Sequence, residues 1–90
     1  MAGGDVRRLE TSAVEVRDPQ GLGRWVRQVR KAKGLTQAEL AGVAGVGVRF
    51  LSEMERGKAS SHLGKVMRVL HRLGCRLRVE VRLPETAGER

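Results

Sequence analysis

The 90-residue sequence is poor in aromatic residues, cysteine and long apolar runs. With no tyrosine, one tryptophan and one phenylalanine, it lacks the stacking platforms on which single-strand and RNA-binding proteins hold bases. Its single cysteine, Cys75, cannot form an internal disulfide and is expected to behave as a small buried hydrophobe. No apolar run approaches the ~20 residues that cross a bilayer, and the N-terminal MAGGDVRRLE lacks the apolar stretch of a signal peptide. We therefore expect one small cytoplasmic domain without a membrane partner.

Catalytic and metal-binding side chains are also scarce. His62 and His71 lie nine positions apart, too far for a metal-binding pair at i and i+4, and there is no second cysteine. The glycine-rich run GVAGVG, residues 42–47, does not follow a predicted strand, so it is not expected to cradle a nucleotide phosphate. The sequence therefore predicts a protein that is not an enzyme and has no cofactor or metal.

Positive charge is abundant and concentrated in the middle of the chain. Residues 18–83 carry fourteen basic and five acidic side chains, a surplus of +9, whereas the whole chain carries +8. Such a field attracts polyanions, either nucleic acid or an anionic membrane surface. Because the aromatic platforms for single strands are missing, double-stranded DNA is the favoured partner.

Apolar periodicity and helix-end signals predict four helices between a flexible arm, residues 1–17, and a disordered tail, residues 84–90. Asp18 and Thr36 have the spacing of N-caps, and the second is followed by Glu39 as in a capping box. Each helix ends close to a glycine, as left-handed helix stops commonly do. The expected helices cover about Pro19–Lys33, residues 36–44, residues 47 or 48 to Arg56, and a segment capped by Ser60 or Ser61 that ends at Gly74.

The segment CRLRVEVRL, residues 75–83, alternates apolar and polar side chains and therefore predicts a half-buried strand. A lone strand is not stable in water, so it needs a partner. That partner could be the same strand of a second subunit or the short stretch around Val14 and Val16; otherwise the segment would fray.

The second and third predicted helices have the features of a helix-turn-helix motif. Ala41 is small where the helices would cross, Gly45 lies in the turn, and Leu51 and Met54 would hold the second helix against the first. The stretch GLTQAELAGVAGVGVRFLSEMERGK, residues 34–58, resembles the lambda-repressor-like helix-turn-helix family. Over residues 18–83 the chain is similar to the HipB-type antitoxins of bacterial toxin–antitoxin operons.

The resemblance implies a mainly α fold, namely a four-helix lambda-repressor-like helix-turn-helix domain over residues 18–74. It also implies a homodimer whose C-terminal strands, residues 75–83, pair with each other. The apolar side chains of that seam would be Leu77, Val79, Val81 and Leu83. The implied function is a repressor of its own operon that neutralises a HipA-like toxin of the serine/threonine-kinase type. A stand-alone regulator of the same family and a protein-binding adaptor on the same fold are the alternatives.

By the same resemblance, the third helix would lie in the major groove, with Val48, Arg49 and Ser52 as base contacts. A guanidinium can bind guanine O6 and N7 together, whereas a valine can contact a thymine methyl. An arginine or valine that is simply exposed to solvent is the alternative for each. Gly47 stands where the family usually has a serine or threonine, so the hydroxyl cap and its backbone contact are lost.

The resemblance also implies contacts to the DNA backbone and one structural ion pair. Thr36 and Gln37 open the second helix, where free N–H groups favour a phosphate, although Thr36 also suits simple capping. Arg56 and Lys58 follow the third helix and match phosphate-binding positions; a solvated charge pair is the alternative. Arg30 and Glu55 match a structural salt bridge. Glu53 would either repel phosphate or accept from cytosine, and the sequence leaves both open.

Overall fold

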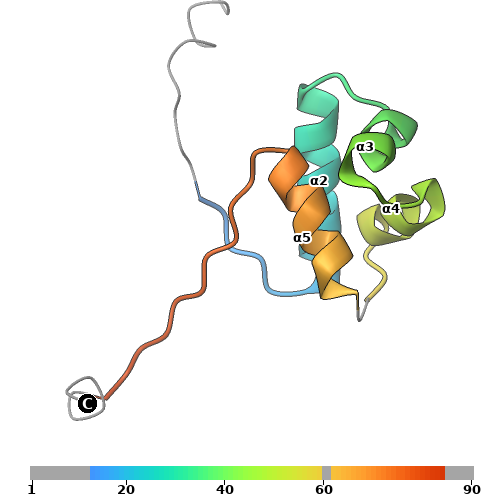
Figure 1. Ribbon diagram of the computed structural model, residues 1–90. Helices are drawn as coiled ribbons and strands as arrows, with labels where there is room; N and C mark the ends of the chain where they lie inside the picture. The colour runs from blue at the N-terminus through green and yellow to red at the C-terminus, as the bar shows by residue number, and fades with distance from the viewer. Residues whose placement is uncertain (1–12, 60–61, 85–90) are drawn as a thin grey trace, which may run out of the picture.

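The computed structural model describes residues 13–59 and 62–84, and these form four helices (Figure 1). The helices follow one another along the chain with short connections, and the described residues between them contain no strand. They are α2, Pro19–Ala32; α3, Gln37–Ala44; α4, Val48–Glu55; and α5, Leu63–Arg72. No described helix has the length and apolar character required to span a membrane.

The ends of α2 and α3 follow the capping signals of the sequence. The Asp18 carboxylate accepts from the Gly21 N–H at 2.7 Å. The Thr36 hydroxyl oxygen accepts from the Glu39 N–H at 3.0 Å, and the Glu39 carboxylate accepts from the Thr36 N–H at 2.8 Å. This reciprocal pair is a capping box, so the predicted start of α3 is confirmed.

The start of α5 differs from the prediction. The helix begins at Leu63 with His62 at the N-cap position and no side-chain cap, whereas Ser60 or Ser61 was expected there. Both serines lie outside the described residues. The apolar stripe of the helix is consistent with its position, because Val69 and Leu70 are buried.

The hydrophobic core receives one fully buried large side chain from each helix. These are Val26, Leu40, Leu51 and Val69. Burying a side chain of this size contributes roughly 1.5–3 kcal/mol to folding relative to leaving it exposed. In the core, α2 packs on α4, and α3 packs on both α4 and α5. Helix α4 is therefore held from behind by two helices.

Two glycines allow this packing. Gly45 has φ 71°, a left-handed conformation that turns the chain from α3 into α4. At Gly23, a Cβ would lie 2.3 Å from the Met54 carbonyl oxygen, so only glycine lets α2 approach the end of α4 this closely.

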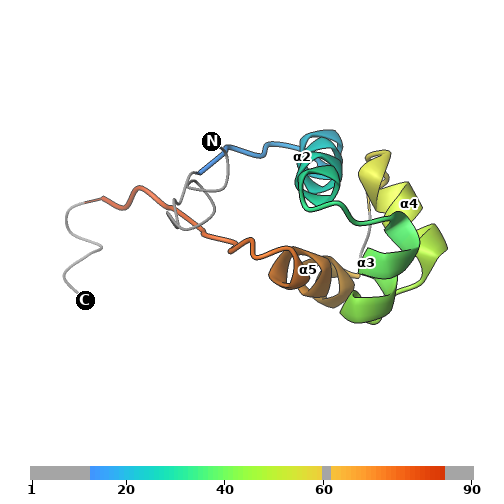
Figure 2. The same cartoon turned by 90° about the horizontal axis from the view of Figure 1, so that it is seen from above.

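The strand expected at residues 75–83 is not formed in the single chain. Residues 75–84 run extended, away from the four helices and on the side opposite α4 (Figures 1 and 2). Among the described residues, no backbone hydrogen bond joins this segment to residues 13–17, which include Val14 and Val16. A strand is defined by its ladder, and a single extended segment has no partner for one. Most of the arm predicted at residues 1–17 and of the tail predicted at residues 84–90 lies outside the described residues, which leave out 1–12 and 85–90.

Candidate nucleic-acid interface

Helix α4 presents one face to the core and the other to solvent at the edge of the molecule (Figure 1). Leu51, Met54 and Glu55 are buried, whereas Val48 is 48% exposed and the Arg49 side chain is 91% exposed. The exposed side chains belong to the first turn of the helix. The arrangement therefore offers a short helix whose N-terminal end is free to enter a groove.

Gly47 occupies the N-cap of α4 and provides no side-chain hydrogen bond there. The helix nevertheless forms, since the Leu51 N–H donates to the Gly47 carbonyl at 3.1 Å. Packing of the buried face thus compensates for the missing hydroxyl cap, whose replacement by glycine costs only a few tenths of a kcal/mol.

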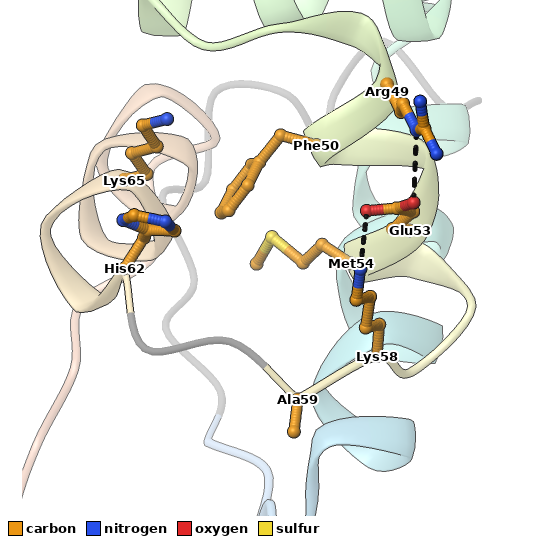
Figure 3. A pocket seen from close by; sticks show the side chains of 8 residues that line it. All are labelled: Arg49, Phe50, Glu53, Met54, Lys58, Ala59, His62 and Lys65. Carbon is orange, nitrogen blue, oxygen red and sulfur yellow. Dashed lines mark hydrogen bonds and ion pairs between the residues drawn. The ribbon is translucent and has the colours of Figure 1, made fainter.

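The outer face of α4 carries a group of linked charges (Figure 3). The Glu53 carboxylate accepts from Arg49 Nε at 3.3 Å and from Lys58 Nζ at 3.2 Å. Lys58, and after it Arg49, hold the pKa of Glu53 below its ordinary value. Glu53 is therefore a carboxylate at neutral pH, placed between two side chains that the sequence predicts to bind DNA.

A second pair follows one turn along α4. Arg56 Nη1 donates to the Ser52 hydroxyl oxygen at 3.1 Å. Ser52 is half-buried, whereas Arg56 is exposed. The structure thus brings a predicted base contact, Ser52, together with a predicted phosphate contact, Arg56.

Arg49, Glu53 and Lys58 border an open hollow between α4 and the beginning of α5 (Figure 3). Phe50 lies on the inner side of the hollow, and Lys65 Nζ lies 5.4 Å from the centre of its ring. Because lysines from both sides line the hollow, Lys65 extends the positive face of α4 across to α5. The sequence analysis did not identify Lys65, because it did not predict that the beginning of α5 lies beside α4.

The two predicted phosphate contacts at the start of α3 already have partners within the protein. The Thr36 hydroxyl belongs to the capping box. Gln37 Nε2 donates to Glu55 Oε1 at 2.9 Å, which uses one of its two amide hydrogens. Gln37 can still offer a phosphate its second amide hydrogen and its own backbone N–H at the start of α3.

Behind α4, Arg30 and Glu55 form a buried, two-point ion pair. Arg30 Nε donates to Glu55 Oε2 at 2.6 Å, and Arg30 Nη2 donates to Glu55 Oε1 at 3.0 Å. Arg30 Nη1 also donates to the Leu35 carbonyl at 2.7 Å. The pair joins α2 to the last residue of α4 and so helps to fix the angle at which α4 is presented.

Burial alone would raise the pKa of Glu55, but hydrogen bonds from Arg30 and Gln37 and the charge of Arg30 outweigh it and lower the pKa. The hydrogen bond to Glu55 raises the pKa of Arg30. Both groups are therefore charged at neutral pH, and each satisfies the other in a buried site.

Arg68 of α5 is a further residue that sequence reasoning missed. Its Nε donates to the Ala44 carbonyl at 3.1 Å and its Nη2 donates to the Gly45 carbonyl at 3.3 Å. These are the free carbonyls at the C-terminus of α3, where a cation is favourable. Arg68 thus supports the turn before α4, and no local pattern in the sequence indicated it.

Comparisons with known proteins agree with this geometry. Residues 26–79 match the model of a protein family described as "Helix-turn-helix". An "Uncharacterized HTH-type transcriptional regulator y4mF" from Sinorhizobium fredii is 51% identical over 63 residues, which are 70% of this chain and 83% of that protein.

Two solved structures have similar folds. One, a variant of HipB in a complex with an O2 20mer, has a TM-score of 0.70 at 26% identity and covers 78% of this chain and 97% of its own. The other, the clp gene regulator ClgR from C. glutamicum, has a TM-score of 0.60 at 36% identity and covers 71% of this chain and 82% of its own.

Proposed function

The chain belongs to the helix-turn-helix family of non-enzymatic, DNA-binding transcriptional regulators, and on this premise we propose that it is a dimeric repressor of its own operon. In this proposal α4 reads bases in the major groove through Val48, Arg49 and Ser52. The phosphates on either side are bound by Thr36, Gln37, Arg56 and Lys58.

The observation that carries the proposal is that one face of α4 is packed in the core while its N-terminal end is exposed. Its inner face is fixed by Leu51 in the core and by the buried Glu55, whereas Arg49 projects almost fully into solvent. A rigid helix with an exposed guanidinium at its N-terminal end has the shape and donors that major-groove reading of guanine requires. Arg56 and Lys58, at the other end, supply positive charge for the flanking backbone.

A homodimer is the second part of the proposal, with residues 75–83 as its seam. Leu77, Val79, Val81 and Leu83 are 58%, 84%, 72% and 57% exposed in the single chain. An extended segment with an open backbone edge and an apolar face is suited to pair with its own copy. Pairing would satisfy the edge and bury these four side chains.

The third part is the role of an antitoxin that binds a HipA-like kinase toxin in the cytoplasm. It is supported by the resemblance of residues 18–83 to HipB-type antitoxins and by the structural likeness to HipB, which extends over 97% of that chain. A toxin-like gene beside this one and a protein that co-purifies with the chain are the expected observations; the absence of both would contradict the role.

A stand-alone regulator is the second candidate function. It is favoured by the identity to two proteins that are named as regulators, 51% to y4mF and 36% to ClgR, against 26% to HipB. The two candidates share the DNA-binding mechanism and differ only in whether a toxin partner exists.

The proposal is tested by titrating the full chain against a duplex from upstream of its own gene and against a scrambled duplex of equal length, at about 0.15 M salt. A repressor of its own operon should bind the native duplex tighter by ~10³ or more. Weak and equal binding to both would contradict autoregulation and leave only the affinity of a polycation for DNA.

The roles of individual residues are tested with two substitutions in the same assay. Arg49→Ala should cost about 1–3 kcal/mol on the native duplex and relax the preference at one base pair. Lys58→Ala should weaken binding to both duplexes by the same factor, because a phosphate contact carries no sequence information. The slope of log affinity against log salt concentration should fall by about one. Equal losses on both duplexes for Arg49→Ala would contradict a base contact.

A further inference from the structure

The Glu53 carboxylate lies between two cations that are proposed to contact DNA, although its negative charge weakens their attraction for phosphate. Its side chain is 24% exposed, whereas those of Arg49 and Lys58 are 91% and 65% exposed. The carboxylate is thus the inner member of the group and the cations are the outer ones (Figure 3). If Glu53 only repelled phosphate, it would simply weaken DNA binding. A carboxylate at this position is useful if it improves the discrimination between DNA sequences.

The geometry of the Arg49 contact indicates what that function is. Glu53 accepts from Nε of the guanidinium at 3.3 Å, one helical turn away on the same face of α4. The two terminal amino groups, Nη1 and Nη2, then remain available. A planar fork of two donors is what binds O6 and N7 of guanine together. Glu53 therefore engages Arg49 on the edge that base reading does not need.

Lys58 completes the arrangement from the other side. Its Nζ lies 3.2 Å from Glu53 Oε1, so the two carboxylate oxygens are each paired with a different cation. The lysine also donates its backbone N–H to the Glu53 carbonyl at 3.0 Å, which places it on the turn directly after α4. The carboxylate is thereby kept ionised and held in place.

We infer that Glu53 is a positioning residue for sequence reading: it orients the Arg49 guanidinium toward a base edge and, by its charge, weakens binding to DNA of unrelated sequence. The inference rests on the proposed function, because it needs a base contact by Arg49. It predicts that removing the carboxylate raises affinity for unrelated DNA while discrimination falls. If Glu53 only stabilised the helix, its substitution would change neither the affinity for unrelated DNA nor the discrimination.

The test uses the full chain, the duplex from upstream of its own gene and the scrambled duplex, with affinity measured over a range of salt. Glu53→Gln keeps the size of the side chain and removes the charge. It should lower the ratio of native to scrambled affinity by about tenfold or more, the discrimination of one bidentate contact. Binding to the scrambled duplex should tighten, because one carboxylate near the phosphates is lost.

Glu53→Asp separates orientation from charge. The aspartate keeps the negative charge but is one methylene shorter, so it does not reach both cations. Discrimination should fall as in Glu53→Gln, whereas affinity for the scrambled duplex should stay close to that of the wild-type protein. The matched control is Glu15→Gln, which removes the same charge from an exposed pair with Arg17 far from α4 in the sequence. It should leave the ratio unchanged.

A double-mutant cycle with Arg49→Ala shows whether Glu53 affects discrimination through Arg49 or by its own contact with DNA. If Glu53 acts through Arg49, then Glu53→Gln should change the ratio by less than about twofold once Arg49 is alanine. An equal drop in both backgrounds would overturn the inference in favour of a direct contact between Glu53 and a base such as cytosine.

Binding of the wild-type protein to the two duplexes distinguishes failure of this inference from failure of the proposed function. Discrimination by the wild-type protein with no difference between Glu53→Gln and Glu15→Gln would overturn this inference and leave the proposed function intact. Equal binding of the wild-type protein to both duplexes would overturn the proposed function and this inference with it.

Discussion

The ion pair between Arg30 and Glu55 is a residue-scale feature on which the position of α4 depends. Both residues are only 7% exposed, and two hydrogen bonds join their charged groups. Among the described residues, no buried side-chain nitrogen or oxygen lacks a hydrogen-bond partner. A pair of this kind adds little net stability when intact, but removal of one partner leaves the other charged and unpaired in the core.

Glu55→Ala is therefore expected to lower the free energy of unfolding by about 3–5 kcal/mol at neutral pH, measured by denaturant titration at fixed protein concentration. The double substitution Arg30→Met and Glu55→Met should lose much less, because no buried charge remains. Glu15→Ala, which breaks an exposed pair, is the control and should cost at most about 1 kcal/mol. Equal losses for the single and the double substitution would contradict this account.

The same pair predicts an acid-side loss of stability. Because the pKa of Glu55 is lowered in the folded protein from its ordinary value of 4.5, the unfolded chain binds more protons in acid. The contribution of the pair is present above about pH 4.5 and is lost as pH falls through the lower, folded pKa. Thermal unfolding between pH 3 and 7 should show a weaker decline in the Arg30→Met, Glu55→Met protein than in the wild-type protein. An equal decline in both would show that other carboxylates dominate.

At the scale of elements, the helices that begin with a local side-chain cap were predictable and the contacts between helices were not. Asp18 and the Thr36–Glu39 box act within one turn of chain, so α2 and α3 could be derived from neighbouring residues. Leu51 and Met54 were expected to face inward, and both are buried.

The remaining features depend on residues far apart in the sequence. The need for glycine at Gly23 comes from the approach of Met54 and Glu55, and the role of Arg68 comes from carbonyls 23 and 24 positions earlier. Periodicity reports which face of a helix is buried but not what lies opposite each position. The two contacts of Glu53 are local, since Arg49 and Lys58 lie only 4 and 5 positions away, yet the sequence analysis placed Glu53 beside the groove without identifying them.

The segment 75–83 is the clearest difference between pattern and structure. Its alternation is a property of the sequence, whereas strand formation requires a second strand, which one chain does not provide. A period of two therefore predicted the extended backbone that is seen but could not identify the partner.

At the scale of the whole molecule, the two surfaces for which we propose different partners lie at opposite ends. Helix α4 lies at one end, and the extended segment 75–84 leaves from the other (Figures 1 and 2). Pairing of the segments would therefore join two chains without covering α4 on either one. Two recognition helices related by a two-fold axis read inverted half-sites, about 34 Å apart when they lie one helical turn from each other.

The dimer is tested by placing a charge on the apolar face of the segment. The wild-type protein is expected to have twice the mass of one 9.9 kDa chain at micromolar concentration, as measured by light scattering or sedimentation. Val79→Lys should give the mass of one chain, because Val79 is the most exposed of the four seam residues and a buried lysine would have no partner there. Val14→Lys, at an exposed valine of the other extended segment, should leave the dimer intact.

Two outcomes of the mass measurement would change this account of the dimer. Dissociation by both substitutions would place residues 13–17 in the seam, and a wild-type mass of one chain would contradict pairing between subunits. Because a dimer contacts two half-sites at once, Val79→Lys should also weaken binding to the native duplex far more than to the scrambled one, although every residue of α4 is unchanged.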